Sequence, residues 1–135
     1  MLNTSSSAET DTELFAHWQR VLPLVRAALR RSGDTHSEAS VLREIYEHRA
    51  QFWCSPDSFV VTEIVDYPLK RVLRIALAGG EIADILAAFH DQVLAWGREH
   101  GCTEAEFNGR LGWHRRLPAR WKRRSETCVF DLREG

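Results

Sequence analysis

Residues 70–101 read KRVLRIALAGGEIADILAAFHDQVLAWGREHG, and this stretch predicts a strand, a tight turn and a long helix in direct succession. Residues 70–78 are apolar and β-branched and lack a helical period. Gly101 is a typical helix stop, because glycine readily adopts the left-handed conformation that follows a helix. Between Gly79-Gly80 and this stop, apolar residues recur at helical spacing, namely Ile82, Ile85, Leu86, Phe89, Val93 and Trp96.

Two amphipathic helices are predicted before this unit. The motif TDTE at residues 10–13 has the spacing of a capping box and precedes an apolar stripe. Pro23 lies inside that stripe and predicts a kink, or a break into two short helices, because proline removes a backbone hydrogen bond. The motif THSE at residues 35–38 repeats the capping-box spacing before a second helix that ends near Arg49. Residues 1–9 are serine-rich, and we expect a disordered tail there.

An antiparallel meander of three strands is predicted next. Residues 51–54 and 59–65 have the period of strands, and the turn-like sequence Ser55-Pro56-Asp57-Ser58 joins them into a hairpin. A second turn at residues 66–68 returns the chain to the strand at residues 70–78.

The remaining elements complete an α+β fold around a mixed sheet. Residues 103–108 predict a strand parallel to the one before the long helix, since a strand–helix–strand unit makes a right-handed crossover. Residues 111–121 predict a short helix interrupted at Pro118, and residues 125–132 predict a last strand. The order is two helices, three strands, a long helix, a strand, a short helix and a strand.

The composition indicates one domain, which we expect over residues 10–135. The chain has 135 residues, 44% of them hydrophobic, which suffices for one core and is too short for two ordinary domains. The formal net charge of −1 gives no overall attraction to nucleic acid or membrane. No apolar run is long enough to cross a bilayer, so we expect no membrane partner and a cytoplasmic location.

Cysteine and histidine spacing predicts neither a disulfide framework nor a metal site. The three cysteines are far apart and form no C-x-x-C pair, which is typical of reduced thiols. The six histidines form no H-E-x-x-H or comparable ligand pattern.

The order of elements resembles the acyl-CoA N-acyltransferase superfamily, known as GNAT, over about residues 10–132. The sequence LAWGREHGC at residues 94–102 is similar to the alanine-rich helix end and glycine that precede the family's fifth strand. A closer resemblance is to small GNAT-like proteins encoded in phage and prophage genomes, often near head and packaging genes. It rests on AQFWCSPDSFVVTEIVDYP (residues 50–68), LRIALAGG (73–80) and WGREHGCTEAEFNGRLGWHRRLP (96–118). This resemblance implies a virion-associated or accessory protein.

The resemblance also implies where acyl-CoA would bind, namely at the turn formed here by Leu77, Ala78, Gly79 and Gly80. In the family a Gln or Arg precedes spaced glycines whose amides hold the pyrophosphate. Here no basic residue precedes the glycines, and Glu81-Ile82-Ala83-Asp84 places acid where phosphate would lie. The family's tyrosine acid has no match in LGWHRRLPARW, and its first strand is missing or hidden in residues 1–9. We therefore expect a degenerate site without a cofactor, or acetyl-CoA if the protein is an enzyme.

No catalytic residue is identified by the sequence. Glu63 or His114 are candidate bases for an acetyl transfer, which needs a deprotonated amine. A carboxylate in the alternation of a strand is more often simply solvated.

A basic segment with tryptophans is the candidate partner-binding region, and its residues are Arg110, Trp113, Arg115, Arg116, Arg120, Trp121, Arg123 and Arg124. Arginine with aromatic residues suits phosphate contacts and base stacking. It equally suits an interface with an acidic protein, because Trp and Arg dominate hot spots. A solvated basic face with its tryptophans packed inward is the structural alternative.

Three functions remain open. The first is a GNAT-fold phage or prophage protein with a degenerate acyl-CoA site, which binds a protein partner, such as a phage structural protein, through this segment. The second is an acetyl-CoA-dependent N-acetyltransferase. The third is a nucleic-acid-associated protein that uses the same basic residues.

Overall fold

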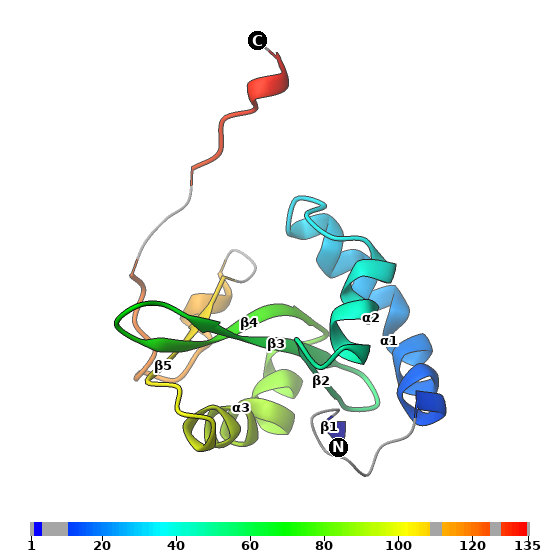
Figure 1. Ribbon diagram of the computed structural model, residues 1–135, viewed down its shortest axis with the longest axis horizontal. Helices are drawn as coiled ribbons and strands as arrows, with labels where there is room; N and C mark the ends of the chain where they lie inside the picture. Colours follow the sequence, from blue (N-terminus) through cyan, green and yellow to red (C-terminus); the bar gives the residue numbers. More distant parts are fainter. Residues whose placement is uncertain (1, 4–10, 109–111, 125–127, 135) are drawn as a thin grey trace.

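A five-stranded mixed sheet with helices on both faces forms the body of the chain (Figure 1). The computed structural model describes residues 2–3, 11–108, 112–124 and 128–134. The predicted α+β class is confirmed. In chain order the elements are β1 (Leu2–Asn3), α1 (Asp11–Arg31), α2 (Glu38–Tyr46), β2 (Gln51–Cys54), β3 (Phe59–Asp66), β4 (Arg71–Gly79), α3 (Ile82–Glu99), β5 (Glu104–Phe107), and the 3-10 turns η1 (Trp113–Arg115) and η2 (Leu132–Glu134).

The strands lie in the order β1-β2-β3-β4-β5. Every neighbouring pair is antiparallel except β4 and β5, which are parallel. The predicted meander and the predicted crossover through α3 are both confirmed. A tight turn suffices for each antiparallel connection, whereas the parallel pair needs the long crossover helix.

Two apolar clusters form the core, one on each face of the sheet. The first lies under α1 and α2 and includes Trp18, Val25, Ile45 and Phe52, all at most 3% exposed. The second lies under α3 and includes Phe89, at 1% exposure. The residues of β3 alternate between the clusters, because successive side chains of a strand point to opposite faces.

The first helix differs from its prediction at Pro23. Helix α1 runs through Pro23 as one helix of 21 residues and is not divided into two. Pro23 lies on the exposed side, so water can satisfy the carbonyl group that loses its amide partner. Thr10, the predicted cap of this helix, lies outside the described residues.

The second helix differs at both ends. Its N-cap is Ser37, which forms a capping box with Ser40, so the predicted Thr35–Glu38 box is wrong. Serine hydroxyls at this spacing satisfy the same two amides that a Thr–Glu pair would. The helix ends at Tyr46, because His48 turns the chain with a φ of 61°.

The ends of the chain depart furthest from prediction. Residues Leu2–Asn3, inside the segment expected to be disordered, form β1 and pair with Trp53 and Cys54. The predicted helix at 111–121 is reduced to the 3-10 turn η1 in its described part. The described part of the predicted last strand, residues 128–132, pairs with no described strand and runs away from the sheet (Figure 1). A strand is stabilised only by a neighbour, so strand propensity alone does not form one.

Candidate functional site

Close packing accounts for both glycines of the turn between β4 and α3. A Cβ atom on Gly79 would lie 2.5 Å from Phe59 and 3.1 Å from Leu24. Gly80 has a φ of +115°, and a Cβ atom there would lie 2.7 Å from Ser58. Neither position leaves room for a side chain, so the glycine pair is explained without a phosphate ligand.

The other two residues of the predicted cofactor site face opposite sides of the sheet. Leu77 belongs to the apolar cluster under α1 and α2, whereas Ala78 packs in the cluster under α3. Of these two residues, only Ala78 therefore lies on the face of the sheet that α3 covers.

The start of α3 is acidic and is tied to the turn between β2 and β3. Glu81 is the N-cap and makes no side-chain capping bond. Asp84 accepts a hydrogen bond of 3.3 Å from the Ser55 hydroxyl, which lies 2.6 Å from the Ser58 hydroxyl. These two carboxylates are stabilised by the positive N-terminal end of the helix dipole, and they repel an incoming phosphate.

The pairing of β4 with β5 ends before this turn. Thr62 and Val61 of β3 pair with Ile75 and Leu77 of β4, so Ala76 is an extra residue that forms a bulge. The pairing of β4 with β5 stops at Ile75. Beyond that residue the outer edge of β4 has no strand partner in the described part of the chain.

An apolar pocket lies between the sheet and α3. Its free volume is about 50 Å³, which suffices for a few water molecules or a small apolar group. A long polar cofactor arm does not fit without displacement of the side chains around it. The lining includes Ile75, Ala78, Ile85, Phe89, Phe107 and Trp121.

Trp121 closes the pocket through a hydrogen bond to α3. Its indole Nε1–H donates to Nε2 of His90 at 2.9 Å. This geometry requires an unprotonated Nε2, so the imidazole proton sits on Nδ1, 3.0 Å from an Asp91 carboxylate oxygen. No sequence pattern assigns His90 a role, since a single histidine on a helix carries no signal of a distant tryptophan.

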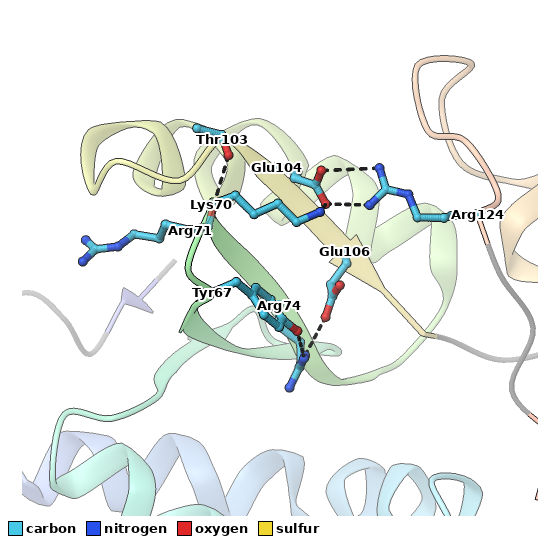
Figure 2. A network of polar contacts seen from close by, with 8 residues as sticks. All are labelled: Tyr67, Lys70, Arg71, Arg74, Thr103, Glu104, Glu106 and Arg124. Carbon is cyan, nitrogen blue, oxygen red and sulfur yellow. Dashed lines mark hydrogen bonds and ion pairs between the residues drawn. The ribbon is translucent and has the colours of Figure 1, made fainter.

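The candidate base Glu63 is held in an ion-pair network on the other face of the sheet. Arg74 donates to Glu106 at 2.7 Å, to Glu63 at 3.3 Å and to the Tyr67 hydroxyl at 3.0 Å; Figure 2 shows Glu106 and Tyr67 around this guanidinium. The hydrogen bond to Glu106 raises the pKa of Arg74. Ile75 lines the pocket, so its neighbour Arg74 points to the opposite face, and Glu63 lies there too. The other candidate base, His114, is exposed on η1.

A second ion-pair group fastens the C-terminal segment to β5 (Figure 2). Glu104 accepts from Arg124 at 2.8 Å and pairs with Lys70 at 3.1 Å. The hydrogen bond from Arg124 is the largest cause that lowers the pKa of Glu104, and the hydrogen bond from Lys70 is the next. Arg124, a predicted partner-binding residue, is therefore engaged within its own chain.

The tryptophans of the basic segment pack inward, as the structural alternative expected. Trp113 stacks on Phe107 with ring centroids 5.8 Å apart and planes 20° apart, and Trp121 covers the pocket. Both are half-buried. Neither indole presents a free face comparable to the stacking platforms of single-strand binders.

Four of the exposed cations of the segment are called the cationic strip: Arg115, Arg116, Arg120 and Lys122. None of them forms an ion pair with another residue that the structure describes. Arg123 is exposed as well, and Arg110 lies outside the described residues. The strip runs along a segment that the inward-facing tryptophans and Arg124 hold against the body.

Within residues 2–3, 11–108, 112–124 and 128–134, no group of three or more His, Cys, Asp or Glu side chains is arranged to hold a metal ion. Among these same residues, no helix has the length and apolar character needed to cross a bilayer.

Comparison with known proteins shows the fold alone. No protein-family model matches the chain, and no curated protein matches it. Two solved structures of the Thermus thermophilus protein TTHA1254, a mutant and the wild type, superpose with TM-scores of 0.57 and 0.56. They are 14% and 12% identical in sequence, and each comparison covers 84% of this chain and 92% of the other. At this identity the likeness concerns the path of the backbone and says nothing about activity.

Proposed function

We propose that this chain is a GNAT-fold protein of phage or prophage type that has lost acyl-CoA binding and acts by binding an acidic protein partner. The cationic strip is the binding surface. The proposal rests on one observation above all: four exposed cations lie without internal ion pairs to described residues on a segment that Trp113, Trp121 and Arg124 hold in place.

The surroundings of the glycine turn support the loss of acyl-CoA. The amides nearest the start of α3 lie beside Glu81 and Asp84, and the glycines are packed against neighbouring side chains. A pocket of about 50 Å³ with an apolar lining offers no partner for a phosphate. An anion there would lose its hydration and gain only repulsion.

The chemistry of the strip supports a protein partner over nucleic acid. Nucleic-acid binders combine a basic surface with exposed aromatic rings or a strongly positive net charge. Here the tryptophans are used for packing, and the net charge is −1. Carboxylates on a protein surface need only the exposed guanidinium groups, which can bind them in a bidentate manner.

The decisive experiment compares binding of a glutamate-rich peptide by the full chain and by two variants. The triple change Arg115→Gln, Arg116→Gln and Arg120→Gln removes three charges from the strip. The control changes Arg30→Gln, Arg43→Gln and Arg98→Gln remove three charges from exposed helical positions elsewhere. We expect the strip variant to bind about tenfold more weakly or worse at low salt, and the control to bind nearly as the parent does.

The same titration with a DNA duplex in place of the peptide tests the alternative function, nucleic-acid binding. Tighter binding to the duplex than to the peptide, lost in the strip variant and steeply dependent on salt, would establish the nucleic-acid function instead. Equal loss in the strip and control variants would show that only total charge matters, which would refute a specific surface.

A second candidate function, acetyl-CoA-dependent N-acetyl transfer, is favoured by the bulge at Ala76 and by the outer edge of β4 beyond Ile75, which has no strand partner in the described residues. A thermal melt with millimolar acetyl-CoA tests it, because a ligand that binds only the folded chain raises its apparent stability. A rise in Tm that Ala78→Leu abolishes by filling the pocket would establish cofactor binding and contradict the leading proposal. An unchanged Tm is the result that we expect.

A further inference from the structure

The C-terminal segment leaves the body of the molecule with its large apolar side chains in solvent. Val129, Phe130 and Leu132 are 88%, 80% and 85% exposed. Figure 1 shows this segment extending away from the sheet. Three such residues in one short stretch form an apolar surface of the kind that marks an interaction site.

The segment has the pattern of a strand with one apolar side. Cys128, Phe130 and Leu132 fall on one side at a two-residue period, while Val129 and Asp131 fall on the other. Its backbone is in neither a helix nor a sheet over residues 128–131. The segment therefore has the side chains of a strand and lacks a neighbour among the described strands.

A matching sheet edge exists in the same molecule. Strand β5 is the last of the sheet, and its pairing in the described residues is with β4 alone. Ala105 and Phe107 contribute to the apolar side under α3, whereas Glu106 faces Arg74 on the other side. A strand added to this edge with Phe130 on the α3 side would extend the apolar layer and satisfy the open backbone groups.

We propose that residues 128–132 of one chain pair with the β5 edge of a second copy, and that two such contacts form a reciprocal dimer. Arg124 is tied to Glu104 at β5, whereas residues 128–134 lie out from the sheet and not along it (Figure 1). The segment is thus presented to another molecule. A second copy carries the same segment and the same edge, so a two-fold arrangement uses both and leaves neither edge open.

Sedimentation equilibrium of the full chain, over about 1–100 μM, tests this self-association. We expect a reversible monomer–dimer equilibrium, and we expect Phe130→Asp to raise the dissociation constant at least about tenfold, because a charge would replace a buried ring. Phe130 is 80% exposed in the single chain, so its change leaves the monomer folded. Phe15→Asp is the matched control, since Phe15 is 45% exposed on α1, which covers the face of the sheet opposite α3.

Hydrogen exchange at residues 104–107 distinguishes a second copy from the chain's own segment. Protection of these amides that rises with concentration and is lost in Phe130→Asp supports the dimer. Protection that is independent of concentration and still lost in Phe130→Asp would mean that the segment folds back on its own β5, and it would overturn the proposal. A monomer at every concentration, with no protection of β5 beyond that from its pairing with β4, would overturn it as well.

Discussion

Gly80 combines a backbone conformation and a contact that a side chain does not tolerate. Its φ of +115° is strained for any other residue, and a Cβ atom would lie 2.7 Å from Ser58 and 2.9 Å from the Asp57 carbonyl oxygen. We expect Gly80→Ala to lower the free energy of unfolding by about 3 kcal/mol, the sum of backbone strain and overpacking. Urea unfolding followed by circular dichroism measures this change.

Gly101 provides the control for that substitution. It also has a positive φ, of +82°, yet no atom lies within 4 Å of its would-be Cβ atom. Gly101→Ala therefore reports backbone strain alone, about 1 kcal/mol. An equal loss at the two glycines would show that the contact with Ser58 contributes nothing. The sequence predicted the turn and the helix stop at these glycines, but the Ser58 contact comes from a strand turn some twenty residues away.

The Glu104–Arg124 pair makes stability depend on pH in one direction. Hydrogen bonds from Arg124 and Lys70 lower the folded-state pKa of Glu104 below its ordinary value of 4.5. The pair's contribution is therefore present above pH 4.5 and is lost as pH falls through the depressed folded-state pKa. We expect Arg124→Gln to be less stable than the parent at neutral pH, and the difference to shrink progressively in acid.

Urea unfolding of both proteins between about pH 7 and pH 2 measures that difference. Arg30→Gln serves as the comparison, because Arg30 is exposed in the last turn of α1 and does not contact Glu104. A constant difference across the whole range would show that the Glu104 pair does not act through its charge.

Among the elements, those with strong periodicity were predictable and those that depend on distant partners were not. The sequence predicted β3, β4 and α3 within one or two residues because their side chains alternate or repeat over many positions. Periodicity did not predict β1, whose two residues are too few for any period, although the resemblance to GNAT left open a first strand hidden in residues 1–9. It also placed a strand at 125–132, where propensity is high but no neighbouring strand is present in the described residues.

The candidate site was predictable to a smaller extent than the fold. The position of the basic segment and its exposed arginines follow from composition, whereas the role of Trp121 depends on His90, which is 31 residues away. Local sequence carries no information on such a contact. The ion pair between Arg124 and Glu104 was not predictable either. In the sequence they are two separate charges, and only the fold brings β5 beside the segment.

Trp121 fixes the segment that carries the cationic strip, and removal of its hydrogen bond to His90 tests this. Trp121→Phe keeps an aromatic ring over the pocket but removes the Nε1–H donor to His90. Loss of one such hydrogen bond costs about 1 kcal/mol, which makes local opening about five times more frequent. We expect trypsin to cleave after Arg115, Arg116 and Arg120 about five times faster.

Cleavage elsewhere in the same chain is the internal control. Arg30 and Arg31 lie in the last turn of α1, far along the chain from the pocket, so their cleavage rate should not change in Trp121→Phe. If both regions were cleaved faster, the substitution would have loosened the whole fold. If neither changed, the hydrogen bond to His90 would have no part in holding the segment.

For the whole molecule, the two proposed surfaces have a joint consequence. A reciprocal dimer carries two cationic strips, so a partner with several acidic sites could engage both at once. Binding to a surface densely coated with glutamate-rich peptide should then be at least about tenfold tighter than binding to the free peptide. Phe130→Asp should remove this gain without changing affinity for the free peptide, because Phe130 is not part of the strip.

Surface plasmon resonance at high and low peptide density measures this gain directly. The strip variant should bind weakly at both densities, and Phe130→Asp should bind weakly at high density only. If Phe130→Asp weakened binding to the free peptide as well, the C-terminal segment would itself contact the partner, because a lost dimer cannot change the affinity of a single strip. If density made no difference to the parent chain, the two strips of a dimer would not reach one surface together, and each chain would act alone.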